Sequence, residues 1–384
     1  MNILVIQMAK IGDLVQTAPL IDGIRKKYPE AFLSILVDSR YAPVASGFSD
    51  VDEVICLNLE SVCSSVNDRK LSLPEKYERV AHELAHFKKR NFGRVYNINS
   101  SMITAIICLF FRKSEIIGYR LNPLTRKHIG EAWAKFILHL MRHRRIMRIN
   151  LVDLWAHYEE QGKATCPHLS FMADAAETGP RSFLPLGDRG GVVIGMQMGC
   201  GGEFRQWPVE YYAALAYKLV REMNACVILL GSRSEQHLGR RFNREWLRMG
   251  GEAPSPGRVI DLIGETSIPE LASTLQACDM VIGGDTGTLH LAAASGTRVA
   301  GLYMGTASCH ETGPYGDGHY VLQACTPCSP CNQGDPNAAC GDPVCLHLIR
   351  PDTVFALVSF MLKMHGKDGP YREIACKAHP FHAF

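Results

Sequence analysis

Short apolar runs alternate with amphipathic segments through both halves of the chain. In the first half this pattern predicts strands at 2–7, 32–37, 54–57, 94–98 and 116–119, and helices at 18–27, 78–89 and 101–111. Strand, helix and strand following one another at the start of the chain form a βαβ unit, so the sheet should be parallel with right-handed crossovers. Residues 61–76 are polar and are predicted to be a loop.

The second half repeats the pattern. Strands are predicted at 192–197, 225–230, 259–262 and 280–283, and helices at 209–223 and 268–277, with Pro208 at the first helical position and a late helix beginning at Pro351. Small polar residues, Gly and Pro between 173 and 191 indicate a domain boundary. We therefore expect two facing Rossmann-like, doubly wound α/β domains (1–180 and 190–350), a ligand cleft between them, and a C-terminal helix and tail at 351–384.

Composition fits this architecture. The 384 residues are 47% hydrophobic and 21% charged, with a net charge of +3, which describes a packed globular protein without the charge of a general nucleic-acid binder. The longest apolar run, 102–111, is about half of the roughly 20 residues that a membrane span needs. The N-terminal run does not resemble a signal peptide, so we expect a cytoplasmic protein.

The stretch from Met280 to Ala294 holds the clearest candidate site. A buried strand ends at Gly283-Gly284, and an Ala/Leu-rich helix follows Asp285 and Thr286. The first amide groups of that helix lack internal partners and would bind an anion at the carboxyl end of the strand. The alternative is an ordinary strand, turn and helix with Asp285 as the helix N-cap.

Residues 112–148 are strongly basic. They contain ten Lys or Arg residues against Glu115 and Glu131, and 131–148 has the spacing of an amphipathic helix. The basic side is either a solvated helix face or a surface for an anionic acceptor or an anionic membrane.

Four cysteines have the spacing of a metal site. Cys328, Cys331, Cys340 and Cys345 lie in an insert, 325–345, that has few apolar residues to hold its shape. Thiolates at such spacing bind Zn or Fe; free thiols and disulfides are the alternatives. Asp50-Val51-Asp52 precedes a strand, at the wrong end of the sheet for a ligand, and is interpreted as a turn.

Four motifs in order resemble one enzyme family. The motifs are Lys10-Ile11-Gly12-Asp13, Arg205-Gln206-Trp207-Pro208, the segment from Gly284 to His290, and Thr312-Gly313-Pro314-Tyr315-Gly316. Together they resemble the motifs of the ADP-heptose:lipopolysaccharide heptosyltransferases. These are inverting glycosyltransferases of the GT-B architecture, and the resemblance covers nearly the whole chain. It implies an acceptor-binding N-terminal domain and a C-terminal domain that binds the nucleotide-sugar.

The resemblance also implies roles for individual residues. Asp13 is the general base, Arg205 contacts the leaving diphosphate, and Lys10 and Gly12 lie on the acceptor side. The implied donor site comprises Gly201, Arg205, Ser232, Glu235, Asp285, Thr286, Gly287 and His290. This chain departs from the family in having Arg205 where Lys is common, in its Gly201-Gly202-Glu203 loop, and in the cysteine-rich insert.

Elementary chemistry is consistent with these roles. An aspartate with a pKa of about 3.9 is ionised at neutral pH, and a positioned general base accelerates a reaction by roughly 10²- to 10⁴-fold. A charge-assisted hydrogen bond from Arg205, about 1.5–3 kcal/mol, should stabilise the leaving diphosphate more than a helix terminus does, about 0.3–2 kcal/mol. Each residue also has an interpretation without a catalytic role. Asp13 can be an acid in a first helical turn, Arg205 a surface arginine and His290 a buried core histidine.

The expected function is transfer of a sugar, heptose from ADP-heptose, to a hydroxyl of a lipopolysaccharide-core or related anionic glycan or glycolipid. Catalysis should require no cofactor. We expect no nucleic-acid partner, but we expect peripheral association with the inner membrane surface. One alternative is the same fold acting on another nucleotide-sugar or on a protein acceptor. An alternative of another class is a non-catalytic metal- or redox-binding protein.

Overall fold

A computed structural model describes residues 1–122, 124, 128–159, 164–169, 191–250, 258–331, 340–364 and 372–377. Internal contacts divide the chain into unit 1, Met1–His143 with Val152–Thr165, and unit 2, Arg144–Leu151 with Cys166–Phe384. Three expected features lie wholly or partly outside the described residues. They are the domain boundary at 173–190, part of the cysteine-rich insert and most of the tail. Within the described part of the chain, no helix has both the length and the apolar character needed to cross a membrane.

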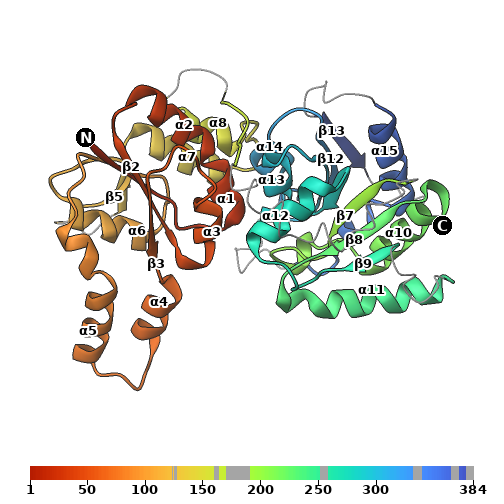
Figure 1. Cartoon of the computed structure of the whole chain (residues 1–384), viewed down its shortest axis with the longest axis horizontal. Helices are drawn as coiled ribbons and strands as arrows, with labels where there is room; N and C mark the ends of the chain where they lie inside the picture. The colour runs from red at the N-terminus through yellow and green to blue at the C-terminus, as the bar shows by residue number, and fades with distance from the viewer. Residues whose placement is uncertain are drawn as a thin grey trace. The chain divides into compact units, whose positions relative to one another are not determined.

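The described residues of unit 1 form a six-stranded sheet in the order β3-β2-β1-β4-β5-β6 (Figure 1). Its strands are β1 (Asn2–Ile6), β2 (Phe32–Asp38), β3 (Glu53–Leu57), β4 (Arg94–Asn97), β5 (Glu115–Leu121) and β6 (His128–Gly130). The first five are parallel, as predicted, but β6 runs antiparallel to β5. The reason is the connection between them, residues 122–127, which is too short for a crossover.

Unit 1 also contains helices and 3₁₀ turns. They are α1 (Ile11–Gln16), α2 (Ala18–Lys27), α3 (Ala42–Ala45), α4 (Leu59–Asn67), α5 (Leu73–Glu83), α6 (Met102–Ile107), α7 (Ala132–Arg142) and α8 (Leu151–Ala156), with 3₁₀ turns η1 (Ser39–Tyr41), η2 (Ala85–Lys89) and η3 (Cys108–Phe111). Buried side chains of β1 and β4 pack against Phe87, Phe92 and Phe111. The rings of Phe92 and Phe111 meet edge to face at 5.3 Å between centroids.

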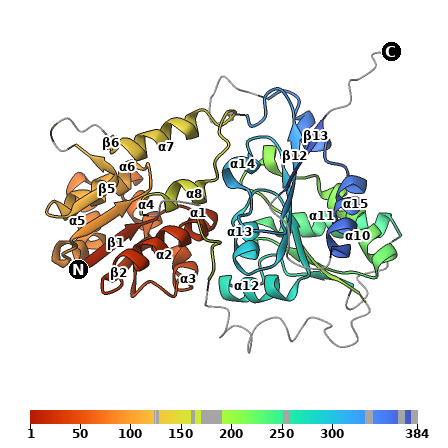
Figure 2. The ribbon, with the colours of Figure 1, turned by 90° about the horizontal axis from the view of Figure 1, so that it is seen from above.

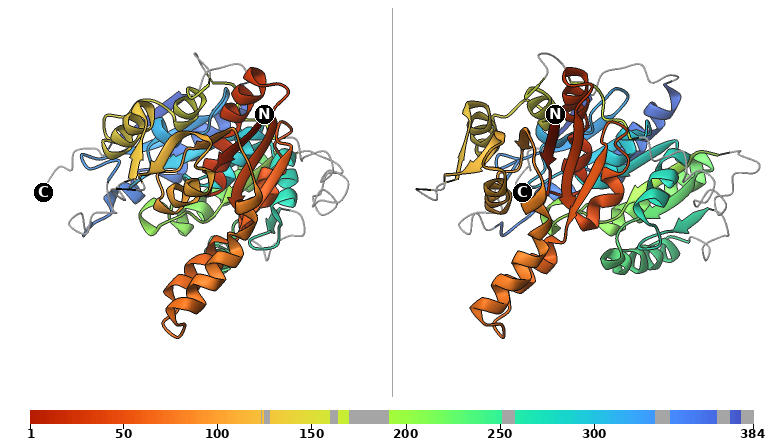
Figure 3. Two further views of the ribbon diagram at one scale, coloured as in Figure 1. Left: turned by 90° about the vertical axis from the view of Figure 1, so that its left-hand side faces the viewer. Right: turned by 60° about the vertical axis from the view of Figure 1, so that its left-hand side comes forward.

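The prediction of a loop at 61–76 is wrong, because α4 and α5 occupy most of it and form a two-helix hairpin (Figure 3). Local capping explains the helices: Asn58 Oδ1 accepts the Ser61 amide at 2.9 Å, and Glu75 Oε2 accepts the Ser72 amide at 2.8 Å. No α5 side chain is buried. A helix outside the core lacks the dense apolar pattern that sequence reasoning looks for.

The predicted helix at 131–148 is also too long. Helix α7 ends at Arg142, and residues 144–151 pack with unit 2. There Arg144 pairs with the buried carboxylate of Glu311, and Asn150 Nδ2 donates to the Gly313 carbonyl at 3.1 Å. At least one arginine of the basic segment therefore has a structural partner.

Unit 2 contains a parallel sheet whose described strands have the order β13-β12-β11-β10-β7-β8-β9. The strands are β7 (Val193–Gln197), β8 (Cys226–Leu230), β9 (Val259–Asp261), β10 (Met280–Gly283), β11 (Arg298–Tyr303), β12 (Tyr320–Cys325) and β13 (Arg372–Lys377). Strand β13 pairs with β12 within the region expected to be a tail. The C-terminal region thus extends the sheet of unit 2.

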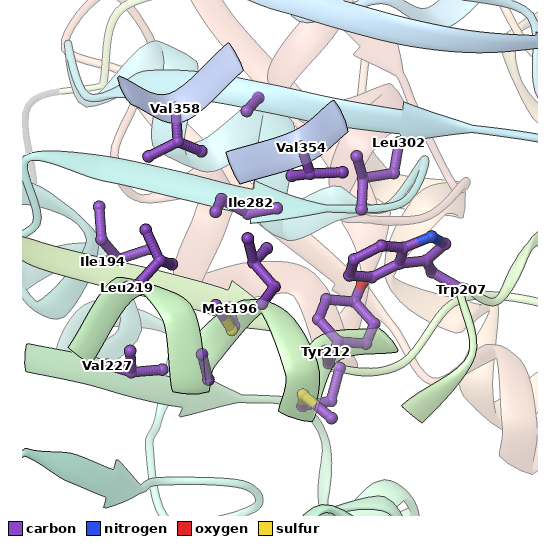
Figure 4. Close-up of a cluster of buried hydrophobic side chains, with 14 of the residues drawn as sticks. Ile194, Met196, Trp207, Tyr212, Leu219, Val227, Ile282, Leu302, Val354 and Val358 are labelled. Carbon is purple, nitrogen blue, oxygen red and sulfur yellow. The ribbon is translucent and has the colours of Figure 1, made fainter. Parts of the chain in front are cut away.

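Helices cover both faces of this sheet (Figure 2). They are α10 (Val209–Met223), α11 (Gln236–Arg248), α12 (Ile268–Ala277), α13 (Gly287–Ala294), α14 (Cys309–Thr312) and α15 (Pro351–Lys363), with 3₁₀ turns η5 (Glu203–Arg205), η6 (Arg233–Glu235) and η7 (Val344–His347). Helices α10, α11 and α15 share one face with a core that includes Trp207, Tyr212 and Ile282 (Figure 4). Pro208 has the extended conformation of the N-cap residue of α10, not the first helical position that we predicted.

Both sheets reverse their strand order next to their first strand. In unit 1 this happens between β1 and β4, and in unit 2 between β7 and β10. Loops leaving such a pair of strands go to opposite faces of the sheet, so a crevice opens beyond their carboxyl ends. The loops after β1, β4, β7 and β10 are therefore where ligand-binding residues are expected. Three of the four motifs follow β1, β7 and β10, whereas the fourth, 312–316, lies between β11 and β12.

Candidate functional site

A buried polar network lies at the carboxyl end of β1 in unit 1. The fully buried Gln7 follows the strand, and its Nε2 donates to Thr17 Oγ1 at 3.0 Å. Its Oε1 accepts Asn99 Nδ2 at 2.6 Å and the Ala9 amide at 3.3 Å. Asn99, in the loop after β4, in turn accepts the Met8 amide on Oδ1 at 2.6 Å. The network fixes the path of the chain from β1 into α1.

This path sets the position of Asp13. Lys10 is the N-cap residue of α1 and makes no side-chain cap bond, so Asp13 lies in the first turn, not at the cap. Gly12 is buried, Lys10 is exposed and Asp13 is half-buried. Thr17 Oγ1 donates to the Asp13 carbonyl at 2.8 Å, which links the backbone of Asp13 to the Gln7 network. Asp13 thus lies in a turn, held by hydrogen bonds, that follows the carboxyl end of β1.

Gln16 adds an unsatisfied donor near Asp13. It lies three residues further along α1, a spacing that places two side chains on one helix side. Its Nε2 is buried and has no hydrogen-bond partner among the described residues. A buried amide without a partner is uncommon in native proteins, and a ligand atom is one way to satisfy it.

In unit 2, Asp285 lies between two cationic or potentially cationic side chains. Arg205 Nη1 donates to Asp285 Oδ2 at 3.1 Å, and His290 Nε2 lies 3.9 Å from Asp285 Oδ1. The pKa of His290 is lowered by its burial, an effect that the Asp285 charge opposes. His290 is therefore neutral at pH 7, and Asp285 and Arg205 form the ion pair of the site.

The turn after β10 exposes the start of α13 and leaves one hydroxyl unsatisfied. Thr286 is the N-cap residue in extended conformation, and its side chain makes no cap bond. Its Oγ1 is buried without a hydrogen-bond partner in the described part of the chain. The alternative interpretation, in which Asp285 is the N-cap residue, is therefore wrong, because Thr286 has that position. The first amides of α13 follow the residue that pairs with Arg205.

The loops after β7 and β10 pack closely. A Cβ built on Gly284 would lie 3.2 Å from the Arg205 carbonyl and 3.4 Å from Cys200 Sγ. Cys200 Sγ donates to the Asp285 carbonyl at 3.5 Å, and burial raises the pKa of this thiol to about 11, so it keeps its proton. Gly284 permits the approach that brings Arg205 to Asp285.

Residues before and after Arg205 in the chain fix its backbone. Its amide donates to the Gly202 carbonyl at 3.0 Å, and Gly201 and Gly202 are exposed. The buried Trp207 donates from Nε1 to the Ile349 carbonyl at 2.8 Å and meets the Tyr212 ring edge to face (Figure 4). A glycine turn before Arg205 and a core indole after it therefore position the guanidinium.

Ser232 and Glu235 follow β8 and approach the same loop. Glu235 Oε2 accepts the Ser232 amide at 2.7 Å. A Cβ built on Gly199 would lie only 1.7 Å from Glu235 Oε1, so the carboxylate rests directly on the Gly199 backbone. The structure thus gathers Glu235 with the loop that carries Gly201 and Arg205.

The four candidate metal-binding cysteines lie in one part of unit 2. The pKa of the Cys345 thiol is raised by burial and, to a smaller extent, by the neighbouring Cys331, Cys328 and Cys340. Within the described residues, however, no three His, Cys, Asp or Glu side chains form a metal-binding group. Residues 332–339, between the second and third cysteines, lie outside that part. The side chains as placed do not fit a bound metal, and we assign no chemistry to one.

The sequence analysis did not single out Gln7, Gln16, Asn99 and Cys200, which the structure places beside predicted site residues. Gln7 carried one available signal, because it is a polar residue directly after the apolar run 3–6. Asn99 had no comparable signal, because its partner Gln7 is 92 positions away in the chain. Such contacts follow from the pairing of β1 with β4.

Comparisons with known proteins identify the family of this chain. Residues 80–338, more than half of the chain, match the model of glycosyltransferase family 9 (heptosyltransferase). Lipopolysaccharide heptosyltransferase 2 of Escherichia coli is 25% identical over 355 residues, covering 87% of this chain and 91% of that protein.

Two solved structures share the fold. A family 9 glycosyltransferase from Veillonella parvula superposes with a TM-score of 0.71 at 16% identity, covering 94% of this chain and 98% of the other. The E. coli ADP-heptose lipopolysaccharide heptosyltransferase II superposes with a TM-score of 0.65 at 18% identity and the same coverage. Two parallel-sheet α/β units of this kind are the GT-B architecture expected from the sequence. The chain therefore belongs to glycosyltransferase family 9, the heptosyltransferases, and is a glycosyltransferase.

Proposed function

We propose that this enzyme transfers a heptose from ADP-heptose to a hydroxyl of the lipopolysaccharide core, with inversion at the anomeric carbon and Asp13 as the general base. The observation that carries the proposal is the position of the four sequence motifs. Three of the four, which hold Asp13, Arg205 and Asp285, follow the strands at the switch points of their sheets, where α/β folds bind ligands. The names of relatives that match over most of their length suggest the donor and the acceptor.

Unit 2 has the groups that a leaving diphosphate needs. When the bond between sugar and phosphate breaks, negative charge develops on the ADP oxygens. Arg205 uses one nitrogen for Asp285, and a guanidinium has five N–H donors, so donors remain for phosphate. The first amides of α13 and the unsatisfied Thr286 hydroxyl supply further hydrogen bonds. Glu235, at the end of β8, is suited to the hydroxyls of a ribose.

Arg205 should contribute more than the helix start. A charge-assisted hydrogen bond is worth about 1.5–3 kcal/mol, against about 0.3–2 kcal/mol for a helix terminus. Its planar guanidinium can also contact two phosphate oxygens in a fixed bidentate geometry, which the compact ammonium group of a lysine does not impose. The neutral His290 fits a hydrogen-bonding role towards the donor better than a charge-neutralising one.

Unit 1 supplies the base. The acceptor hydroxyl must lose its proton as its oxygen attacks the anomeric carbon, and an ionised aspartate accepts that proton. Asp13 is half-buried in a first helical turn, where the helix dipole favours the carboxylate form. Lys10, exposed at the start of the same helix, is placed to meet an anionic acceptor. Gln16 Nε2, buried and unsatisfied one turn from Asp13, is a further donor for acceptor oxygens.

We place the enzyme in the cytoplasm, at the inner membrane surface where a lipid-linked acceptor would be exposed. The exposed side of α7 supports this: Lys135, His139 and Arg142 are exposed there, with no acid within the helix. Arg144 lies outside this surface because of its pairing with Glu311.

The test is product formation with a defined acceptor. Purified enzyme is incubated with ADP-heptose or with a panel of other nucleotide-sugars, together with a heptose-deficient lipopolysaccharide core or a protein acceptor, and products are identified by mass spectrometry. Asp13→Asn should reduce turnover by roughly 10²- to 10⁴-fold, while its affinity for ADP stays at the wild-type value. Transfer from another donor or to protein only would replace the substrate assignment, and full turnover by Asp13→Asn would remove Asp13 as the base.

A further inference from the structure

The turn after β11 is fixed by one buried polar side chain of the neighbouring strand. Gln323, on β12, donates from Nε2 to the carbonyls of Tyr303 and Ala307 at 3.3 and 3.4 Å, and its Oε1 accepts the Cys309 amide at 3.1 Å. The side chain is 7% exposed, so these bonds replace water that it has lost. Because they reach residues before and after the turn, they fix its shape.

Gly305 lies in the middle of this turn and touches the backbone of the Arg205 loop. Its φ of +59° is in the left-handed region. A Cβ built on Gly305 would lie 1.8 Å from the carbonyl oxygen of Phe204 and 2.9 Å from its carbonyl carbon. Both are backbone atoms, so a new methyl group could not be accommodated without moving η5. Glycine meets both demands because it has no Cβ.

This contact bears directly on Arg205, because Phe204 is the residue before it. The next carbonyl, that of Arg205, lies against Gly284 in the same way, 3.2 Å from the position of its Cβ. Glycines of two loops, after β10 and after β11, therefore hold two consecutive carbonyls. The guanidinium that follows pairs with Asp285 at 3.1 Å. A shift of Phe204 would pass to Arg205 through the backbone.

The cysteine-rich insert contacts the same glycine. The Cys331 amide donates to the Gly305 carbonyl at 3.0 Å. Burial raises the pKa of the Cys345 thiol, and a hydrogen bond from the Gly305 backbone opposes this effect. Cys331 and Cys345 belong to the two described parts of the insert, so both parts meet at Gly305. The insert is thereby connected to the loop that carries Arg205.

We propose that Gly305 is a positioning residue for Arg205. The turn after β11, fixed by Gln323 and by the cysteine-rich insert, supports the Phe204 carbonyl and so sets the place of the guanidinium. A bidentate contact with phosphate needs the planar guanidinium in one place, so a displaced backbone should weaken binding of the diphosphate. The inference rests on the role of Arg205 in the proposed function and gives the insert a part in it.

Calorimetric titration of the full-length enzyme with ADP tests the proposal. Gly305→Ala should lower ADP affinity about tenfold or more, and Gln323→Leu, which loosens the turn without adding bulk to the contact, about three- to tenfold. Arg205→Ala should itself lose about tenfold or more. Adding Gly305→Ala to Arg205→Ala should cost less than about twofold further, because the displaced group is already gone. A merely structural effect would lower the affinity by the same factor in both backgrounds.

Gly250→Ala is the matched control. Gly250 also has a positive φ, +79°, but its Cβ would lie in open space, so the variant adds backbone strain without a clash and should bind ADP as the wild type does. Circular dichroism checks the fold of each variant. Should Gly305→Ala fail to fold, Gln323→Leu with and without Arg205→Ala supplies the same comparison.

Two results would overturn the inference while the proposed function stands. They are wild-type ADP affinity in Gln323→Leu or in folded Gly305→Ala, and an equal loss with and without the Arg205 side chain. Wild-type ADP affinity in Arg205→Ala would be a different result. It would overturn the role of Arg205 in the proposed function and, with it, this inference.

Discussion

Gln7 and Thr17 are joined by a 3.0 Å hydrogen bond between Gln7 Nε2 and Thr17 Oγ1, beneath the turn that carries Asp13. Thr17 passes this constraint on through its own bond to the Asp13 carbonyl. The end of β1 and the first turns of the following helices are therefore fixed to each other by side chains, and not only by the backbone of a short loop.

From this link we predict that Gln7→Leu lowers kcat by about ten- to a hundredfold, because a small misplacement of a catalytic group is enough for such a loss. Affinity for ADP should stay unchanged. Steady-state kinetics and calorimetric titration with ADP measure the two effects. Ser34→Ala is the control: Ser34 is also fully buried in the sheet of unit 1 and bonds to Glu53 at 3.0 Å, yet lies away from Asp13 in the chain. Equal losses of kcat in both variants would contradict a positioning role for Gln7.

Gly199→Ala should weaken donor binding although it replaces no charged residue. The new Cβ would meet Glu235 Oε1 at 1.7 Å, so the carboxylate must move away from the loop. We expect ADP affinity to fall about tenfold or more, measured by calorimetric titration. Gly202→Ala, in the same loop, places its Cβ in open space and should bind ADP as the wild type does. Unchanged affinity in Gly199→Ala would remove Glu235 from the nucleotide site.

Asp285→Asn should lower kcat/KM about ten- to a hundredfold, since it replaces the ion pair that orients Arg205 with a neutral contact. The matched control is Asp279→Asn at the other end of β10, where Asp279 accepts the Val193 amide at 2.8 Å. That variant should lose stability but retain kcat/KM. If Asp285→Asn keeps wild-type kinetics, Arg205 is positioned by other contacts.

His290 should make the enzyme less stable in mild acid. Its burial lowers its pKa below the ordinary 6.5, so the unfolded chain takes up a proton at a higher pH than the native protein. The contribution of His290 to the free energy of unfolding therefore has its full value above about pH 6.5. It is lost as the pH drops from there through the native pKa. In urea unfolding at pH values from about 7.5 to 5, His290→Gln should show a shallower decline than the wild type. If the free energy of unfolding falls equally with pH in the wild type and in His290→Gln, the pKa of His290 is the same in the folded and unfolded states.

Metal analysis of the purified enzyme checks the remaining prediction from the cysteine spacing. Because the described thiols form no ligand group, we expect Cys345→Ser to leave transfer activity within about twofold of the wild type. A stoichiometric metal that this variant loses together with activity would contradict that expectation.

The sequence alone determined the α/β class, the parallel direction of most strands and the loops that carry the motifs. Buried parallel strands are short runs of apolar residues, as at 280–283, and the helices between them keep a 3.6-residue apolar period, as at 209–223. Both signals are local, so they can be read along the chain. The charged motif residues could also be found there, since Asp13, Arg205 and Asp285 interrupt glycine-rich or apolar surroundings.

Only the tertiary structure decided which of these residues meet. Arg205 and Asp285 are 80 positions apart, and Gln7 and Asn99 are 92 apart, so their contacts depend on the pairing of β7 with β10 and of β1 with β4. The same holds for the hairpin at 59–83, whose helices are specified by caps and by each other and not by a core-facing pattern. Local periodicity reflects burial against the nearest layer, whereas a site is made by side chains that different strands bring to one edge of the sheet.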